Sequence, residues 1–163
     1  MARASRMFPL VAGALALCAF TAPTLAADLA TQGWDQGRGV YLLPDQHGAQ
    51  FGLVAYEDRP THRVSYGFRE LPQRANCAAG SIGRSAVFDI EGQRLAFRRE
   101  CINGTFTFVP RSTPTRRAFE GLLASHTVLH MRAPSFFPYT FDLAGLPAVH
   151  QALNVQIARR AAR

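Results

Sequence analysis

Two histidines, His126 and His130, are the residues with the clearest capacity for chemistry, and they lie four positions apart. On a strand or a helix, side chains at this spacing share a face, so the two imidazoles could form half of a metal site. A zinc site needs three or four converging ligands, and the fold would have to bring His150 or Asp142 close. We therefore expect a structural or surface histidine pair and no cofactor, with metal binding as the alternative.

The serines of this chain do not form a hydrolase motif. The candidate nucleophiles are Ser81, Ser85, Ser112 and Ser125. None of them lies in a Gly-x-Ser-x-Gly pattern, and the sequence has neither a phosphate-binding loop nor a dinucleotide fingerprint. We expect Asp142, just before the last predicted helix, to cap that helix or to stabilise its N-terminus by charge rather than to act as a catalytic acid. The sequence thus favours a protein without catalytic residues.

Three cysteines occur in the chain, and two of them suggest a disulfide. Cys18 lies inside an apolar run near the N-terminus, whereas Cys77 and Cys101 are 24 positions apart. That separation lacks the close spacing of a redox motif, and an even pair in an oxidising compartment is typical of a disulfide. We predict a Cys77–Cys101 disulfide, with a reactive thiol as the alternative.

An aromatic cluster is the candidate binding surface. Phe136, Phe137 and Tyr139 lie in an irregular stretch, and Trp34 is a further member. Exposed, these rings would form a binding surface for a protein, a lipid or a glycan. Buried, they would be ordinary core, which is where most aromatic residues of a small domain lie. The sequence favours the core interpretation and leaves the other open.

The first 26 residues have the pattern of a secretory signal peptide. Arg3 and Arg6 form a positive leader, the run 8–20 is apolar, and small residues follow it. This arrangement is recognised by the translocon and by signal peptidase, and we place the cleavage after Ala26, with Ala27 as the alternative. The apolar run is too short to span a bilayer, which takes about 20 residues. Residues 27–163 then form one exported domain.

The charge is basic but scattered. All 18 basic residues are arginine, which is typical of codon bias in a GC-rich genome, and the pI is about 10.3. Loss of Arg3 and Arg6 with the signal peptide lowers the formal net charge from +7 to +5. No long basic run is interleaved with aromatic residues, so we exclude nucleic acid as a partner. Contact with an anionic envelope surface remains an interpretation.

Alternating apolar residues and turn signals predict a mainly β fold of the α+β class. A three-stranded antiparallel meander is expected over 85–109, with turns at Glu91-Gly92-Gln93 and Asn103-Gly104, the second being a favoured tight-hairpin sequence. Other strands are predicted at 39–43, 50–57, 63–68, 126–131 and 138–143. Residues 28–37 look like a loose N-terminus. The result should be an antiparallel, β-sandwich-like domain.

Two helices complete the predicted domain. Ser112-Thr113-Pro114 is a helix-start signal for a short helix over 112–124. A C-terminal helix over 146–160 follows from apolar residues at helical spacing. Those residues are Leu146, Val149, Leu153 and Ile157.

The segment from Phe119 to Leu153 resembles the end of invasion-associated locus B proteins and related type VI secretion-associated periplasmic proteins. The similarity covers about 115–155 and includes Val-Leu-His-Met-Arg and then Tyr-Thr-Phe-Asp-Leu-Ala-Gly-Leu-Pro-Ala-Val-His-Gln-Ala-Leu. The secretion-associated relatives carry one cysteine near the start and one after the last helix, and this chain departs from that. The resemblance implies an exported β-sandwich-like protein without catalytic residues to carry over.

Together these features predict a non-catalytic interaction or accessory protein of the bacterial envelope, periplasmic or secreted, whose partner is an envelope or host protein. One alternative is a hydrolase-like envelope enzyme with a site assembled from scattered residues. The other is a carrier of small apolar ligands with a pocket lined by phenylalanines.

Overall fold

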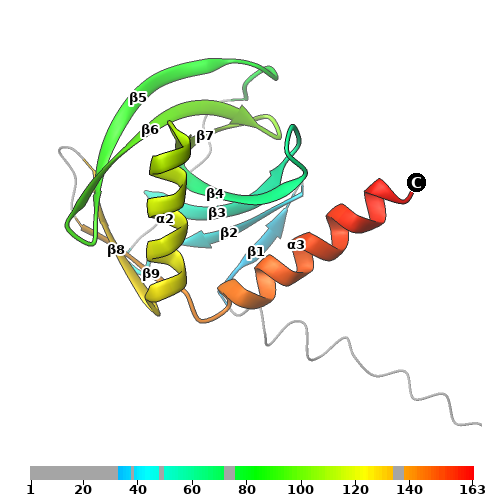
Figure 1. The fold of residues 1–163 in the computed structure, drawn as a ribbon. Helices are drawn as coiled ribbons and strands as arrows, with labels where there is room; N and C mark the ends of the chain where they lie inside the picture. The colour runs from blue at the N-terminus through cyan, green and yellow to red at the C-terminus, as the bar shows by residue number, and fades with distance from the viewer. Residues whose placement is uncertain (1–32, 38, 48–49, 72–75, 134–137) are drawn as a thin grey trace, which may run out of the picture.

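The computed structural model describes residues 33–37, 39–47, 50–71, 76–133 and 138–163, so the predicted signal peptide lies outside the described residues. Nine strands form one sheet (Figure 1). They are β1 (Asp35–Gly37), β2 (Val40–Pro44), β3 (Phe51–Asp58), β4 (Arg63–Glu70), β5 (Ile82–Ile90), β6 (Gln93–Ile102), β7 (Thr105–Pro110), β8 (Val128–Arg132) and β9 (Pro138–Asp142). The described residues also form the helices α2 (Thr113–Ser125) and α3 (Leu146–Ala161).

The strand order is β1-β2-β3-β4-β7-β6-β5-β8-β9, and every pairing is antiparallel. The mainly β, α+β architecture predicted from the sequence is therefore confirmed, including its β-sandwich-like sheet. Residues 35–37, which were expected to be part of a loose N-terminus, instead form β1 because they pair with β2.

The sheet curves strongly, and the chain after β2 reaches β9 (Figure 1). The backbone N–H of Gln46 donates to the carbonyl of Thr140 over 3.0 Å. The backbone N–H of Thr140 donates in turn to the carboxylate of Asp45 over 2.6 Å. Asp45 is buried, and its second carboxylate oxygen accepts from the backbone N–H of His47. These bonds occupy polar backbone groups on β9 that would otherwise be unpaired at a sheet edge.

The predicted meander is present as β5, β6 and β7, and its turns have the expected backbone. Glu91 and Gly92 have φ values of 50° and 77°, and Asn103 and Gly104 have values of 50° and 79°. Positive φ at both central residues defines the two-residue turn whose twist matches that of antiparallel strands. The Asn-Gly signal in the sequence thus placed the β6–β7 turn correctly.

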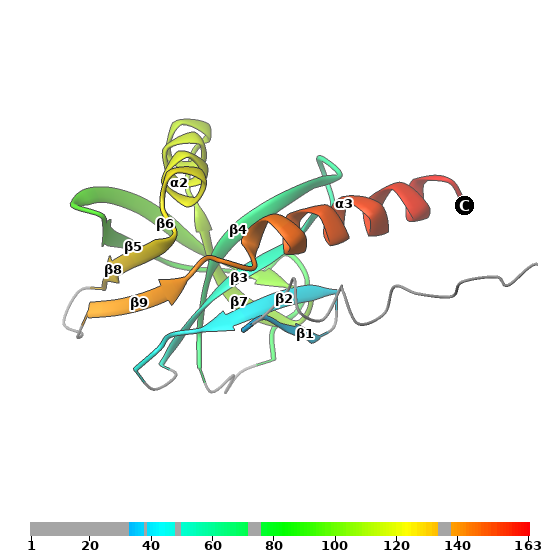
Figure 2. The same cartoon turned by 90° about the horizontal axis from the view of Figure 1, so that it is seen from below.

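Phenylalanines fill the core on the face of the sheet that both helices cover (Figure 2). Phe68 of β4 is fully buried, and its ring contacts those of Phe88, Phe97, Phe119 and Phe141 at centroid distances of 5.2–5.7 Å. Aromatic pairs at such distances add stability beyond the area that they bury. Phe68 therefore joins β4 to the meander, to α2 and to β9.

A smaller cluster lies on the opposite face of the sheet and includes Val54, Tyr56 and Val109. Beside it, the guanidinium of Arg69 is buried and donates to the Thr107 hydroxyl over 3.0 and 3.2 Å. Burial lowers the pKa of Arg69. The sheet is thus packed on both faces, as its β-sandwich-like form requires.

Helix α2 begins where the sequence predicted. The Ser112 hydroxyl accepts from the backbone N–H of Thr115 over 3.3 Å, and Pro114 lies in the first turn. Its buried side chains, Phe119, Leu122 and Leu123, pack into the core. This apolar face fixes α2 against β6 and β7.

Helix α3 packs against β3 and β4 through Leu146, Val149, Leu153 and Ile157, as their spacing predicted. The expectation that Asp142 caps this helix is wrong. Gly145 is the N-cap, and the Asp142 carboxylate instead accepts from the backbone N–H of Ala144 over 3.0 Å. An aspartate two residues before its donor stabilises a turn, and here that turn leads into α3.

The predicted disulfide joins Cys77 to Cys101, whose Cα atoms are 5.7 Å apart. Cys101 lies near the end of β6, as expected, and the backbone N–H of Cys77 donates to the carbonyl of Gly104 over 3.1 Å. The disulfide therefore ties the segment before β5 to the β6–β7 hairpin.

Candidate binding cleft

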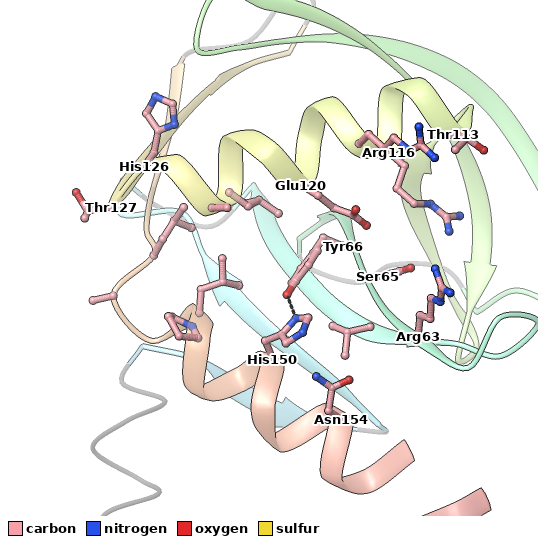
Figure 3. A pocket seen from close by; sticks show the side chains of 18 of the residues that line it. Arg63, Ser65, Tyr66, Thr113, Arg116, Glu120, His126, Thr127, His150 and Asn154 are labelled. Carbon is pink, nitrogen blue, oxygen red and sulfur yellow. Dashed lines mark hydrogen bonds between the residues drawn. The ribbon is translucent and has the colours of Figure 1, made fainter. Parts of the chain in front are cut away.

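An open cleft of about 840 Å³ lies between α2, α3 and β4 (Figure 3). Ligand sites in proteins typically have volumes of about 300–1,000 Å³. The helices form this cleft because each is anchored to the same face of the sheet by its own apolar stripe. The polar flanks of both helices then face one another across β4.

Arginines give the cleft a basic lining. Arg63 comes from β4, and Arg116 and Arg117 come from the first half of α2. Arg116 pairs with Asp58 over 3.4 Å. Among the described residues, neither the Arg63 nor the Arg117 guanidinium has a hydrogen bond or ion pair, and both residues are exposed. The cleft therefore presents two arginines to which the described part of the chain supplies no partner.

The α2 arginines also sit at an electrostatically unusual place. The N-terminal end of a helix carries a partial positive charge, so acidic residues are favoured there and cations are not. The first turn of α2 has no acidic residue, and Arg116 and Arg117 follow directly after it. The helix dipole and the guanidinium groups thus add up to a positive potential at this end of the cleft.

The other part of the lining is apolar. Leu123 comes from the last turns of α2, and Leu143, Leu146 and Pro147 come from the segment that enters α3. All three leucines are largely buried, so they form a floor rather than projecting ridges. A ligand that fits the cleft would need both an anionic part and an apolar part.

Tyr66 and His150 meet at the centre of the cleft (Figure 3). The Tyr66 hydroxyl lies 2.5 Å from Nδ1 of His150, and the two rings are stacked with an interplanar angle of 23°. Burial raises the pKa of Tyr66 above its usual range, and the carboxylate of Glu120 raises it further. The phenol is therefore neutral and can donate to Nδ1, which leaves the proton of a neutral His150 on Nε2 as a further donor.

His126 and His130, expected to be a structural or surface pair with half of a metal site as the alternative, do not lie on one element. His126 is the C-cap of α2, and its Nδ1 lies 2.9 Å from the carbonyl of Leu122. His130 lies on β8, and its Nδ1 is 3.4 Å from the Thr140 hydroxyl. The described residues contain no group of three or more His, Cys, Asp or Glu side chains that could hold a metal ion. Each of the two histidines thus makes its own contact, one at the end of α2 and the other on β8.

Ser125 and His126 resemble a catalytic pair only in their distance, which is 3.0 Å from hydroxyl to Nδ1. The Ser125 hydroxyl donates to the carbonyl of Gly121 over 2.8 Å, and Nδ1 of His126 faces the Leu122 carbonyl. Both side chains therefore bond carbonyls of the last turns of α2, which is a structural role at the end of the helix. A catalytic pair would instead need the histidine to accept the serine proton.

Of the four residues in the predicted aromatic cluster, the structure describes two, and both lie in the core. Trp34 and Tyr139 are buried, with 7% and 4% of their surface exposed. They are therefore core residues and not part of an exposed binding surface, because Trp34 packs in the main core cluster and the Tyr139 ring packs 5.0 Å from that of Phe51. Phe136 and Phe137 lie outside the described residues.

Sequence reasoning named His150 only as a possible further metal ligand and missed both Tyr66 and the contact between them. Tyr66 and His150 are 84 positions apart, so no local spacing connects them. Two weak signals pointed to them. Tyr66 shares a face of β4 with the core residues Val64 and Phe68, and His150 directly follows the core residue Val149 of α3. A polar side chain beside an apolar helix stripe is placed at the edge of a packed interface.

Comparisons with protein families, with curated proteins and with solved structures find no match to this chain. Within the described residues, the helices are too short or too polar to cross a bilayer. The residues of the cleft therefore have to be interpreted from their own geometry.

The buried phenols predict a loss of stability at high pH. Burial raises the pKa values of Tyr56 and Tyr66, so the folded protein keeps these phenols protonated above pH 10, where the unfolded chain loses its protons. The unfolded state then binds fewer protons than the native state, and the free energy of unfolding falls by up to about 1.4 kcal/mol per pH unit for each phenol. Urea unfolding at pH 9 and pH 11 measures this loss.

Phenylalanine variants provide the control for this prediction. Tyr66→Phe and Tyr56→Phe should each reduce the difference in stability between the two pH values, and the double variant should reduce it most. A Tyr66→Phe protein with the same pH-dependent loss as the parent would contradict the assigned burial of the phenol.

Proposed function

We propose that this protein is an exported, non-catalytic interaction module of the bacterial envelope and that the cleft between α2, α3 and β4 binds its partner. The partner is an envelope or host protein, and the location is the periplasm or the cell exterior. The predicted signal peptide and the disulfide support export, because disulfides persist in oxidising compartments. The resemblance to invasion-associated locus B proteins supports the same role by analogy.

The observation that carries the proposal is a pair of exposed arginines that have no hydrogen bond or ion pair within the described residues and that share a cleft with an apolar floor. Exposed arginines are normal on a surface, but Arg63 and Arg117 line one cleft from two different elements. Arginine is common in protein interfaces because its planar guanidinium can bond a carboxylate with two parallel hydrogen bonds. A partner that supplies carboxylates would pair with two guanidinium groups that the described residues leave without a partner.

The contacts of the candidate catalytic groups support a binding role over the alternative of an envelope hydrolase. Tyr66 is held protonated, which makes it a poor nucleophile. Nδ1 of His150 faces the Tyr66 hydroxyl, and the Ser125 and His126 side chains face helix carbonyls. The alternative of an apolar carrier draws less support, because the central phenylalanines contact one another in the core.

Charge reversal in the cleft tests the proposal. The exported chain carries Arg63→Glu and Arg117→Glu together, and it is used to recover proteins from envelope extract beside the parent chain. We expect the partner recovered by the parent to be reduced at least tenfold with this variant, because two attractive contacts become repulsive.

A matched variant removes the effect of net charge. Arg94→Glu and Arg159→Glu change the same number of exposed arginines at positions that do not line the cleft. This control should recover the partner as the parent does, provided that both variants show cooperative thermal unfolding. Equal recovery by the cleft variant and the control would refute the cleft as the binding site.

A further inference from the structure

The cleft is elongated rather than compact. Its lining runs from Thr113, the first residue of α2, to His126 and Thr127 just beyond the last. Figure 3 shows these residues at opposite ends, with Tyr66 and His150 between them. A helix of 13 residues is about 20 Å long. An extended chain rises about 3.3 Å per residue, so a segment of about six residues matches this length.

The two ends of the cleft differ in charge. Figure 3 shows Arg63 and Arg116 at the end near Thr113. Leu123 lies near the other end, because it belongs to the last turns of α2, and Leu146 begins α3. A bound segment would therefore be acidic at one end and apolar at the other.

Polar groups suited to a peptide backbone lie between these ends. His150 and Asn154 are four residues apart on α3, so their side chains point from the same face into the cleft (Figure 3). Nε2–H of a neutral His150 can donate to a peptide carbonyl, and the Asn154 amide can both donate and accept. A small amphiphilic anion has no such series of backbone groups to use.

Glu120 adds selectivity against acids in the middle of the segment. It is half-buried, and within the described part of the chain its carboxylate has no hydrogen bond or ion pair. It projects from α2 toward Tyr66 in Figure 3. A carboxylate placed opposite it would be repelled, so acidic residues are favoured only at the arginine end.

We infer that the cleft binds an extended segment of the partner, about six residues long, with acidic side chains at Arg63 and Arg117 and apolar side chains at Leu123 and Leu146. This inference rests on the proposed function, since it names the part of the partner that the cleft holds. The segment adds carboxylates beside two guanidinium groups for which residues 33–37, 39–47, 50–71, 76–133 and 138–163 supply no partner.

Selection from a phage-displayed library of random dodecapeptides tests the inference. The parent chain should enrich peptides that carry Asp or Glu on one side of a short neutral stretch and Leu, Ile, Val or Phe on the other. The Arg63→Glu/Arg117→Glu variant should lose this enrichment and select Lys or Arg at the same positions. The Arg94→Glu/Arg159→Glu control should select the same peptides as the parent.

The selected peptide is then synthesised with a fluorescent label and titrated by anisotropy. We expect Arg117→Gln to weaken its affinity about tenfold, as for loss of a charge-assisted hydrogen bond, and Arg159→Gln to leave it unchanged. A second peptide carries one additional Glu at its centre. We expect the unmodified protein to reject this peptide and the Glu120→Gln variant to bind it, which a purely structural role of Glu120 does not predict.

Two results would overturn the inference. One is a library selection with no acidic enrichment in the parent relative to the charge-reversed variant. The other is binding of octanoate at the cleft with no peptide selected, which would identify a small amphiphilic anion instead. In both cases loss of the envelope partner from the Arg63→Glu/Arg117→Glu variant would still support the proposed function, so the two claims fail separately.

Discussion

Replacing Phe68 with alanine should lower the free energy of unfolding by about 3–5 kcal/mol, the range measured for removal of a buried phenylalanine. The side chain is fully buried, and its ring contacts four other phenylalanines from β5, β6, α2 and β9. Deletion leaves a cavity whose walls belong to four elements, and these cannot all move inward together. Urea unfolding followed by circular dichroism measures the change.

Phe106 is the matched control for this substitution. It lies on β7, two residues before the buried Phe108, and it is only half-buried, with the guanidinium of Arg99 4.7 Å above its ring. Phe106→Ala removes the same atoms but much less buried contact, so it should cost clearly less than Phe68→Ala. Equal losses for the two variants would contradict the central position of Phe68 in the core.

Loss of the disulfide should destabilise the protein by about 3 kcal/mol, because Cys77 and Cys101 close a loop of 24 residues in the unfolded chain. The double variant Cys77→Ser/Cys101→Ser measures this loss in the same urea assay. Single variants are less informative, since they leave a free thiol.

Reducing the disulfide chemically provides an independent comparison with the double variant. The parent protein in reductant should unfold at the same urea concentration as the double variant, and the variant itself should not respond to reductant. Mass spectrometry of the exported protein should show both thiols oxidised. Two free thiols in protein isolated from the periplasm would contradict the predicted disulfide.

The elements with local signals were predictable from the sequence. Ser112 and Pro114 marked the start of α2, Asn103-Gly104 marked the β6–β7 turn, and apolar spacing marked α3. In each case a few neighbouring residues determine the backbone through capping, positive φ or amphipathic periodicity. Such features can be predicted from neighbouring residues because they do not depend on contacts with distant parts of the chain.

Features that depend on distant parts of the chain were not predictable in this way. β1 forms because residues 35–37 pair with β2. The hydrogen bond from the Thr140 N–H to the Asp45 carboxylate joins positions 95 residues apart. The placement of Asp142 as a helix cap failed for a related reason, since its carboxylate bonds a turn that precedes Gly145. Tertiary context decided these outcomes over local preference.

The candidate site shows the same division. The sequence drew attention to His126 and His130 because they are close in the chain, yet they make separate contacts on α2 and β8. The pair that does meet, Tyr66 and His150, is contributed by a strand and a helix that only the folded sheet brings together. Trp34 and Tyr139 were candidates for a surface but are needed in the core.

The most direct test of the binding cleft is photo-crosslinking of the exported protein in living cells. A benzophenone amino acid replaces Asn154, which lines the cleft, or Arg94, which is exposed but does not line it. We expect a covalent adduct with a cellular partner from position 154, which is lost when Arg63→Glu and Arg117→Glu are added, and no such adduct from position 94. Equal adducts from both positions, or an adduct at position 154 that survives the charge reversal, would contradict it.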